Sequence, residues 1–324
     1  MAGVSRSAVS RAFTPNAYIS PIAKAKVMEA AAALGYRPDS LAQNMARGRS
    51  NMVVLVINKI NSIREPGVHA SILKAVLDSG RLPVVLTVPP RDDGASILKQ
   101  HLTFPIEGIV VMSDSVSALS VHEAAPHMRP IMINRDSYNS SVDAVRTDDA
   151  TGINDMVEHL WRTGHRTIAF MAGRETSVVS DVRKNALLLA IAKKGMRLVG
   201  EARGNFRYED AFAAAHDLVS GDDVPDAIFC ASDTMGFGVM DHIRMKTIYR
   251  VAKDISIIGY DDSIVAAWPS YDLSTIREDV EQHARAVIDI LDRRKTQETP
   301  EPIQITTVSE FVLRSSVRPK DGRL

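Results

Sequence analysis

The chain of 324 residues contains one cysteine, two tryptophans and no long apolar run. Cys230 alone cannot form an intramolecular disulfide, which fits a reducing compartment. No stretch approaches the ~18 uninterrupted apolar residues of a membrane span, and the first residues lack the apolar core of a signal peptide. These absences predict a cytoplasmic protein and argue against a secreted binding protein of a transporter.

Signatures of enzymes are also missing. There is no Gly-x-Ser-x-Gly elbow and no phosphate-binding P-loop, and Gly236-Phe-Gly238 lacks the third glycine of a dinucleotide motif. His122-Glu123 begins like a zinc-protease helix, but Pro126 stands where the second histidine is needed. The sequence therefore predicts no catalytic residue, no metal site and no cofactor.

The formal net charge is zero, but the charges are unevenly distributed. Residues 1–50 contain seven basic and two acidic residues, which gives +5 and leaves −5 for the remainder. The basic residues are Arg6, Arg11, Lys24, Lys26, Arg37, Arg47 and Arg49. A basic head on a mildly acidic body is typical of a DNA-contacting module joined to a sensor.

Residues 4–13 have the spacing of a short amphipathic helix that Ser5 is suited to cap. One face is apolar, with Val4, Ala8, Val9, Ala12 and Phe13. The other face carries Arg6, Ser7, Ser10 and Arg11. Arginine pairs with guanine in a major groove, and hydroxyls reach phosphates or base edges. On composition alone, an ordinary surface helix is an equally good interpretation.

Two further helices are predicted before residue 51. Ser20-Pro21 is a helix start, and Gly35 is the stop. The segment 38–50 has Leu41 and Met45 one turn apart and a basic end. A helix this short is marginal alone, so we expect it to form on meeting a partner. In a minor groove, Met45 would act as a wedge between base steps.

Residues 2–12, Lys26-Val27, Leu34-Gly-Tyr-Arg-Pro38 and Leu41-Ala42 together resemble the DNA-binding headpiece and hinge of the LacI/GalR family. The resemblance implies that Ser5, Arg6, Ser7, Ser10 and Arg11 contact DNA, with Leu41 and Met45 at the minor groove. Met45 stands where the family usually has leucine, and Gln43 where arginine is common. The family's first headpiece helix precedes the residues that open this chain. Two interpretations stay open, a true start further upstream or a weakened headpiece.

From Met52 the pattern changes to short apolar runs separated by helices, which predicts parallel strands covered on both faces. Strands are expected at 52–58, 83–88, 108–113, 130–134 and 145–148, and then at 167–172, 227–232 and 255–260. The sequence thus predicts an α/β fold with two lobes in series. The resemblance implies a sensor similar to periplasmic sugar-binding proteins, in which the chain crosses between lobes near residues 149, 276–279 and 305–308.

Polar residues at strand ends are the candidates for a ligand site. By resemblance, Asp148, Arg183, Asp233 and Asp261 are effector-contacting positions, and Asp262 braces their loop. Phe229 and Trp268 offer apolar surface for a sugar-like ligand. For a single Asp after a strand, a helix cap or a surface ion pair is the more common role. The exit of the first strand, 60–66, lacks the family's aromatics and carries the charged residues Arg64 and Glu65 instead. This loss of aromatic surface suggests an effector other than a plain neutral sugar, such as a sugar acid or another small polar anion.

The sequence therefore predicts a cytoplasmic transcription regulator, most simply a repressor, that works as a homodimer on near-palindromic operator DNA under the control of a small polar effector. The alternative is a ligand sensor without specific DNA binding. Expected domains are a partial headpiece at 1–37, a hinge helix at 38–50 and an effector-binding and dimerisation domain at 51–324. Its first lobe would comprise about 51–148 plus 278–305, and its second about 149–277 plus 306–319.

Overall fold

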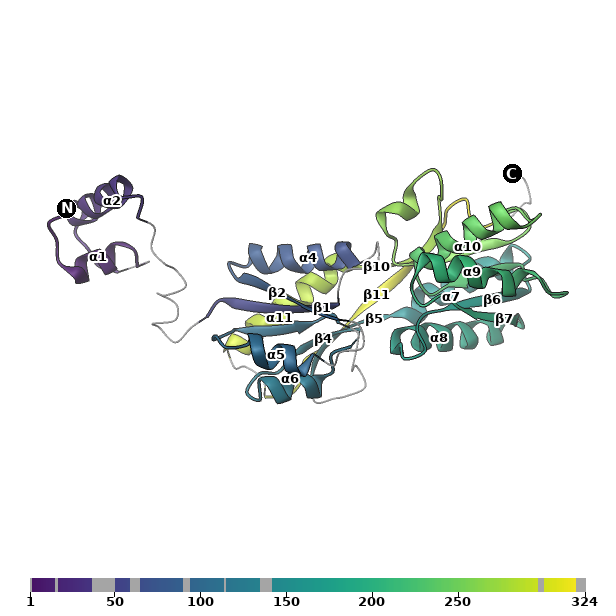
Figure 1. The fold of residues 1–324 in the computed structure, drawn as a ribbon, viewed down its shortest axis with the longest axis horizontal. Coiled ribbons are helices and arrows are strands. Elements are labelled where there is room, and N and C mark those ends of the chain that lie inside the picture. The colour runs from purple at the N-terminus through teal and green to yellow at the C-terminus, as the bar shows by residue number, and fades with distance from the viewer. Residues whose placement is uncertain are drawn as a thin grey trace. The chain divides into compact units, whose positions relative to one another are not determined.

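The computed structural model describes residues 2–14, 17–36, 50–58, 65–89, 94–113, 115–134, 142–296 and 300–318. These residues form two compact units, Met1–Asn51 and Met52–Leu324. Leu41, Met45 and Arg64 lie outside the described residues, so the predictions made for them stay predictions. Figure 1 shows the order of the elements along the chain.

The first unit contains two short helices, α1 (Arg6–Ala12) and α2 (Pro21–Ala33). Each begins at a serine whose hydroxyl accepts a backbone N–H: Ser5 from Ala8 at 3.3 Å and Ser20 from Ala23 at 3.3 Å. Such caps satisfy amides that the first turn leaves without a partner. The predicted starts of both helices are confirmed.

The second unit begins with a lobe, called lobe 1, whose sheet has the parallel order β2-β1-β3-β4-β5. Its strands are β1 (Met52–Asn58), β2 (Leu82–Val88), β3 (Gly108–Val111), β4 (Ile131–Ile133) and β5 (Asp143–Asp148). Its helices are α4 (Glu65–Asp78), α5 (Ala95–His101), α6 (Ala118–Ala124) and α11 (Val280–Thr296).

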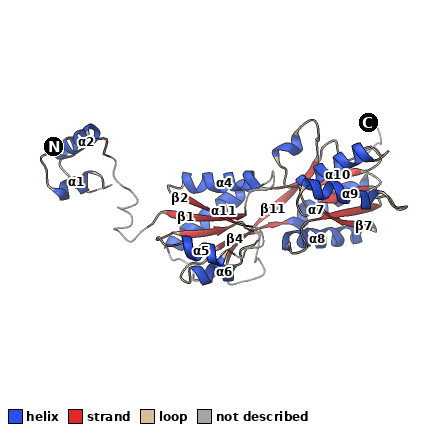
Figure 2. Cartoon of the chain, in the orientation of Figure 1, coloured by secondary structure: helices blue, strands red, loops and turns tan. Residues whose placement is uncertain are grey.

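Alternate residues of β1 enter different cores. Val53 and Leu55 pack with residues of α4 and α11, whereas Val54 and Val56 pack with residues of α5 and α6. Figure 2 shows α4 above the strands of lobe 1 and α5 and α6 below them. A central strand that buries both faces needs apolar residues throughout, which explains the run Met52-Val-Val-Leu-Val-Ile57.

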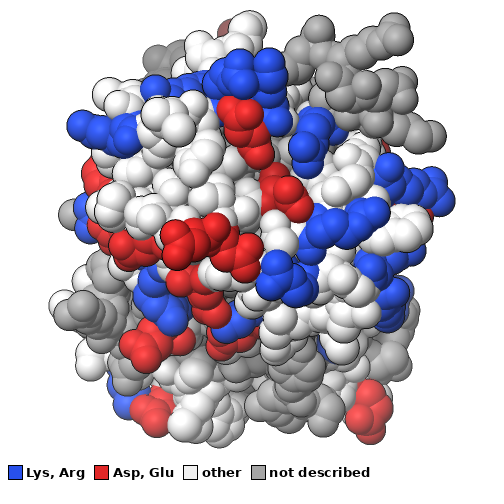
Figure 3. Space-filling model, turned by 90° about the vertical axis from the view of Figure 1, so that its right-hand side faces the viewer, with Lys and Arg blue, Asp and Glu red and all other residues white. Residues whose placement is uncertain are grey.

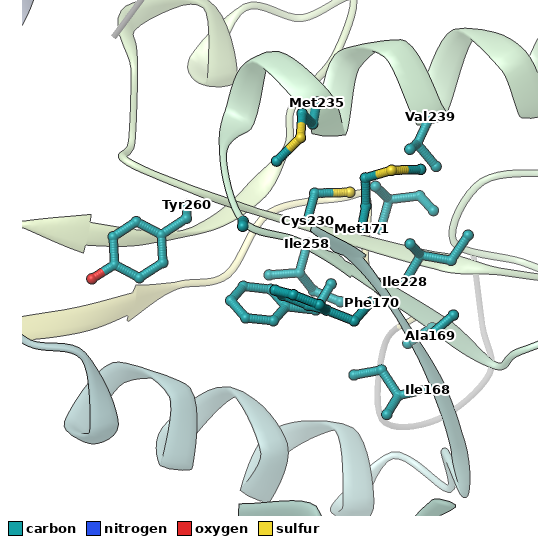
Figure 4. Packing of buried hydrophobic residues seen from close by; sticks show 14 of the residues in the cluster. Ile168, Ala169, Phe170, Met171, Ile228, Cys230, Met235, Val239, Ile258 and Tyr260 are labelled. Atoms are coloured by element: carbon teal, nitrogen blue, oxygen red, sulfur yellow. The ribbon is translucent and has the colours of Figure 1, made fainter. Parts of the chain in front are cut away.

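Lobe 2 has the same plan, with the strand order β10-β9-β8-β6-β7. Its strands are β6 (Thr167–Ala172), β7 (Arg197–Arg203), β8 (Ala227–Cys230), β9 (Ser256–Tyr260) and β10 (Ser274–Glu278). Its helices are α7 (Asp149–Arg162), α8 (Val178–Lys194), α9 (Tyr208–Val219), α10 (Asp233–Lys246) and the 3-10 turn Ile264–Ala267. Strands β6, β8 and β9 supply the centre of its core, part of which Figure 4 shows.

One strand joins the two lobes. The first part of β11 (Gln304–Val312) runs parallel to β5 up to Val308, and its second part, from Ser309, runs antiparallel to β10. The chain also passes from β5 into α7 and from β10 back to α11 of lobe 1. The predicted α/β fold with two lobes and parallel sheets is confirmed. No helix in the described part of the chain is long and apolar enough to cross a membrane.

Candidate functional site

Helix α1 presents a polar face to solvent. Ser5, Arg6, Ser7, Ser10 and Arg11 are all exposed, whereas Ala12 is buried and Val9 and Phe13 are half-buried. Arg11 lies along the helix, because its Nε donates to the carbonyl oxygen of Ser7 and its Nη2 to the Ser7 hydroxyl, both at 3.2 Å. The exposed face therefore offers two guanidinium groups and three hydroxyls, which are groups that bind phosphates and base edges.

Helix α2 supports this face from behind. Val27 and Ala31 are buried, and the rings of Phe13 and Tyr36 lie 5.7 Å apart in a tilted contact. An apolar groove of about 320 Å³ remains between the helices, lined by Ala2, Val9, Phe13, Val27, Ala30, Ala31, Leu34 and Tyr36. Ile22 of α2 is 73% exposed. The two helices alone therefore leave apolar surface uncovered.

A group of buried charged residues surrounds Arg183 of α8 where the lobes meet. The Arg183 side chain is 1% exposed. Its Nη2 donates to Oε1 of Glu278 at 2.9 Å, and its Nε donates to Oδ1 of Asp149 at 3.2 Å. Its Nη1 donates to the carbonyl oxygen of Ala231 at 2.8 Å. The guanidinium is therefore held by groups of its own chain.

Tyr260 completes this group. The guanidinium carbon of Arg183 lies 3.4 Å from the centre of the Tyr260 ring, and the Tyr260 hydroxyl donates to Oδ1 of Asp149 at 2.6 Å. Figure 4 shows Tyr260 at the edge of the buried cluster, with its hydroxyl pointing away from Phe170. Burial raises the pKa of Asp149 and the pKa of Tyr260. Lobe 2 thus ends in an ordered polar surface next to lobe 1.

Two acidic residues predicted at the site lie close by, Asp261 in the loop after β9 and Asp233 at the start of α10. Asp233 is buried and accepts hydrogen bonds from Thr275 Oγ1 at 2.5 Å, Ser263 N at 2.7 Å and Ser263 Oγ at 2.9 Å. It therefore anchors the loop, and burial raises its pKa to about 6. Oδ1 of Asp261 lies 3.8 Å from Nη1 of Arg183. Asp261 also has a φ of 122°, a strained value for a residue other than glycine.

Asp262 pairs with Arg277 and with Arg314, each at 2.6 Å. These ion pairs fix the same loop from its other side, so the predicted bracing role of Asp262 is confirmed.

Three other predicted residues are not among those that line the hollow next to Arg183. Asp148 caps α7, accepting Ala150 N at 3.1 Å and Thr151 Oγ1 at 2.7 Å. Phe229 is fully buried in the core of lobe 2 and offers a ligand no surface. Trp268 is 52% exposed after the 3-10 turn. The expectation that ligands bind beyond the carboxyl ends of parallel strands identifies the correct edge of the sheet. It does not say which of two adjacent residues points toward the ligand.

A hollow of about 70 Å³ lies between the lobes next to Arg183. It is lined by Asn134, Arg146, Thr147, Asp149, Val178, Val179, Val182 and Arg183. Sequence reasoning had found only Arg183 among these. Asn134 could have been found from the sequence, because it is a polar residue directly after the apolar strand β4. It has a φ of 53°, and its Oδ1 accepts a hydrogen bond from the N–H of Thr147 at 2.8 Å. Arg146 lies within β5 rather than beyond a strand end, so its position in the sequence does not indicate a site.

The charges of the two units differ in arrangement. The face at the right-hand end of Figure 1, drawn in Figure 3, has Lys and Arg next to Asp and Glu. Residues 1–50 instead have the excess of seven basic over two acidic residues. Attraction to a polyanion such as DNA is therefore strongest at the first unit.

Comparison with known proteins agrees with both units. Residues 1–39 match the bacterial regulatory proteins of the lacI family, and residues 157–317 match the periplasmic binding protein-like domain. A probable HTH-type transcriptional repressor ExuR of Bacillus subtilis is 28% identical, with 98% of this chain and 96% of the relative covered. The chain therefore has a lacI-family regulatory domain followed by a periplasmic binding protein-like domain, and it is similar over nearly its whole length to LacI/GalR transcription regulators. HTH-type transcriptional regulator CelR of Thermobifida fusca is also 28% identical over the same shares.

Solved structures of this family have the same fold. The lac repressor dimer bound to operator and the anti-inducer ONPF matches with a TM-score of 0.89 at 22% identity, covering 98% of this chain and 97% of that one. A complex of the regulator CelR with cellobiose matches with a TM-score of 0.74 at 26% identity, covering 97% of each chain.

Proposed function

We propose that this LacI/GalR regulator is a repressor that binds near-palindromic operator DNA as a homodimer and responds to a small polar effector between its lobes. The proposal rests chiefly on the exposed arginine and serine face of α1, in a chain whose fold matches operator-bound lac repressor. A two-fold symmetric dimer presents two such helices to two half-sites. Ser5, Arg6, Ser7, Ser10 and Arg11 then contact DNA, and Leu41 and Met45 act at the central minor groove.

The contacts between the lobes provide a route for the effector signal. Glu278 accepts hydrogen bonds from Arg183 of lobe 2 and from Asn134 Nδ2 of lobe 1, at 2.9 and 3.4 Å. A ligand at this place changes the balance between open and closed lobes by the difference in its affinity for the two. The same difference sets how far operator affinity shifts.

Operator binding is tested by fluorescence anisotropy with a pool of palindromic duplexes at two salt concentrations. We expect selection of one sequence, with an affinity well above that for random DNA. Only salt-sensitive binding without sequence preference would refute the regulator mechanism. The second candidate, a ligand sensor without specific DNA binding, would then apply. The uncovered groove between α1 and α2 is the observation that favours it.

Replacing Arg11 with Ala is expected to relax operator discrimination by about tenfold or more. The reason is that a guanidinium that reads guanine loses both of its hydrogen bonds. The measurement compares the affinities for the selected operator and for duplexes changed at single positions. Lys24→Ala on α2 is the control for loss of charge, and it should weaken all duplexes alike. An unchanged sequence preference in Arg11→Ala would exclude the reading role.

Replacing Met45 with Ala is expected to weaken specific binding more than non-specific binding. A wedge side chain acts only where the duplex is kinked, whereas non-specific binding depends mainly on phosphate contacts. The two affinities are measured on the selected operator and on random DNA. Met45→Leu is the conservative control and should keep the operator affinity. Equal losses on both DNAs would contradict the wedge.

A further inference from the structure

Two arginines line the hollow between the lobes, Arg146 and Arg183. Of these two, Arg146 has no acidic partner among the described residues. Its Nη2 donates to Oε1 of Gln304 at 2.6 Å. Its Nε is buried and has no hydrogen-bond partner among the described residues. No carboxylate of the described chain lies within ion-pair distance of it. A buried donor without a partner is destabilising, so its presence at a hollow needs an explanation.

Three other arginines withdrawn from solvent are neutralised by carboxylates. Arg81 pairs with Glu107 and Asp292, and Arg314 pairs with Asp262. Arg183, across the hollow from Arg146, faces Asp149 and Glu278. Arg318 also has a buried Nε without a partner, but it does not line the hollow. Among the described residues, Arg146 alone combines the absence of a carboxylate partner with a position at this hollow.

We propose that the effector carries an anionic group, a carboxylate or a phosphate, that binds Arg146 in this hollow. The inference rests on the proposed effector role of the space between the lobes. An anion in the hollow would pair with the charge of the Arg146 guanidinium, which no carboxylate of the described residues neutralises. Charge-assisted hydrogen bonds of this kind are stronger than neutral ones. The volume of about 70 Å³ admits several waters and hence a group of this size, with the rest of the effector extending beyond it.

The neighbouring groups are compatible with an anion at this place. Asp149 is the carboxylate in the lining, and Arg183 and the Tyr260 hydroxyl hold its Oδ1. Glu278 is also engaged by Arg183. Val178, Val179 and Val182 form an apolar wall that keeps water from screening the pair. Asn134, at the lobe 1 side, adds a side-chain amide within the same lining.

The test follows the arginine Nε–Hε signals of the full chain by NMR during titration with acetate, with inorganic phosphate and with chloride at matched ionic strength. The variants Arg146→Gln and Arg318→Gln assign the two signals. We expect the Arg146 signal to shift saturably with acetate or phosphate, with an apparent affinity at least about tenfold above that for chloride. The Arg318 signal serves as the internal control and should drift only with ionic strength.

In Arg146→Gln, the Arg183 signal from the same hollow should no longer respond saturably to the anions. Saturation by acetate alone indicates a carboxylate group, and saturation by phosphate alone indicates a phosphate group. An Arg146 signal that drifts linearly, as Arg318 does, with all three anions would overturn the proposal. Operator binding is measured separately by anisotropy, so a chain that binds no anion but selects an operator refutes this inference and leaves the regulator function standing.

Discussion

Replacement of Arg183 with Met is expected to lower the free energy of unfolding by about 3–5 kcal/mol. Methionine fills a volume similar to that of the arginine side chain. The main effect of the substitution is therefore the removal of the positive charge that compensates two buried carboxylates. Asp149 and Glu278 lose their hydrogen bonds from Arg183, and Tyr260 loses the guanidinium stacked on its ring. Urea unfolding followed by circular dichroism measures the change.

A triple variant separates the charge from the shape. Adding Asp149→Asn and Glu278→Gln to Arg183→Met removes the uncompensated charges, so most of the stability should return. The single variant should also recover as the pH falls, since protonation neutralises carboxylates that have no counter-ion. If the triple variant is as unstable as the single one, packing rather than charge accounts for the loss. A stable Arg183→Met would show that the buried ion pairs contribute little.

The fold was largely predictable because both faces of the central strands are buried. Strands β1 and β6 were predicted with the bounds that the structure gives, and both are apolar except for one terminal residue, Asn58 in β1 and Thr167 in β6. Strand β7 was missed, because at the sheet edge its sequence Arg197-Leu-Val-Gly-Glu-Ala-Arg203 is mixed and half-exposed. Helix α9 was missed with it, in a segment whose alanine-rich pattern was not assigned.

The site was less predictable, because it depends on side-chain direction and on segments far apart in the chain. Asp148 and Asp149 are adjacent, yet the first caps α7 and the second meets Arg183. Glu278 belongs to β10 and joins Arg183 across 95 residues of sequence. Arg146 gives no local signal, since its importance arises from what is absent around it. By contrast, the solvent face of α1 follows from helical spacing alone and was predicted completely.

Acidification is expected to destabilise lobe 2 through His165. This side chain is fully buried, with Nδ1 near the carbonyl oxygen of Leu160 at 3.0 Å and Nε2 near Ser256 Oγ at 2.8 Å. Burial lowers its pKa from 6.5 to about 4. The unfolded chain therefore takes up this proton first, so stability is lost as the pH falls from 6.5 to 4. The full effect is about 3 kcal/mol.

Asp233 has the opposite effect to His165 on the pH dependence of stability. Burial raises its pKa from 3.8 to about 6, so the folded chain takes up this proton first. Its destabilising effect is complete above pH 6 and is relieved as the pH falls toward 3.8. Between pH 6 and pH 5 the two groups nearly offset each other. The unmodified chain should consequently show only a shallow change of stability in this range.

Two variants reveal the two effects separately. In His165→Gln, the remaining Asp233 should make the free energy of unfolding rise by about 1 kcal/mol from pH 6.5 to 5. In Asp233→Asn, the remaining His165 should make it fall by about 2 kcal/mol over the same range. The comparison uses the pH slope rather than the absolute stability, since both substitutions also disturb hydrogen bonds. Parallel slopes in the two variants would show that neither buried group controls the acid response, whereas opposite slopes assign it to this pair.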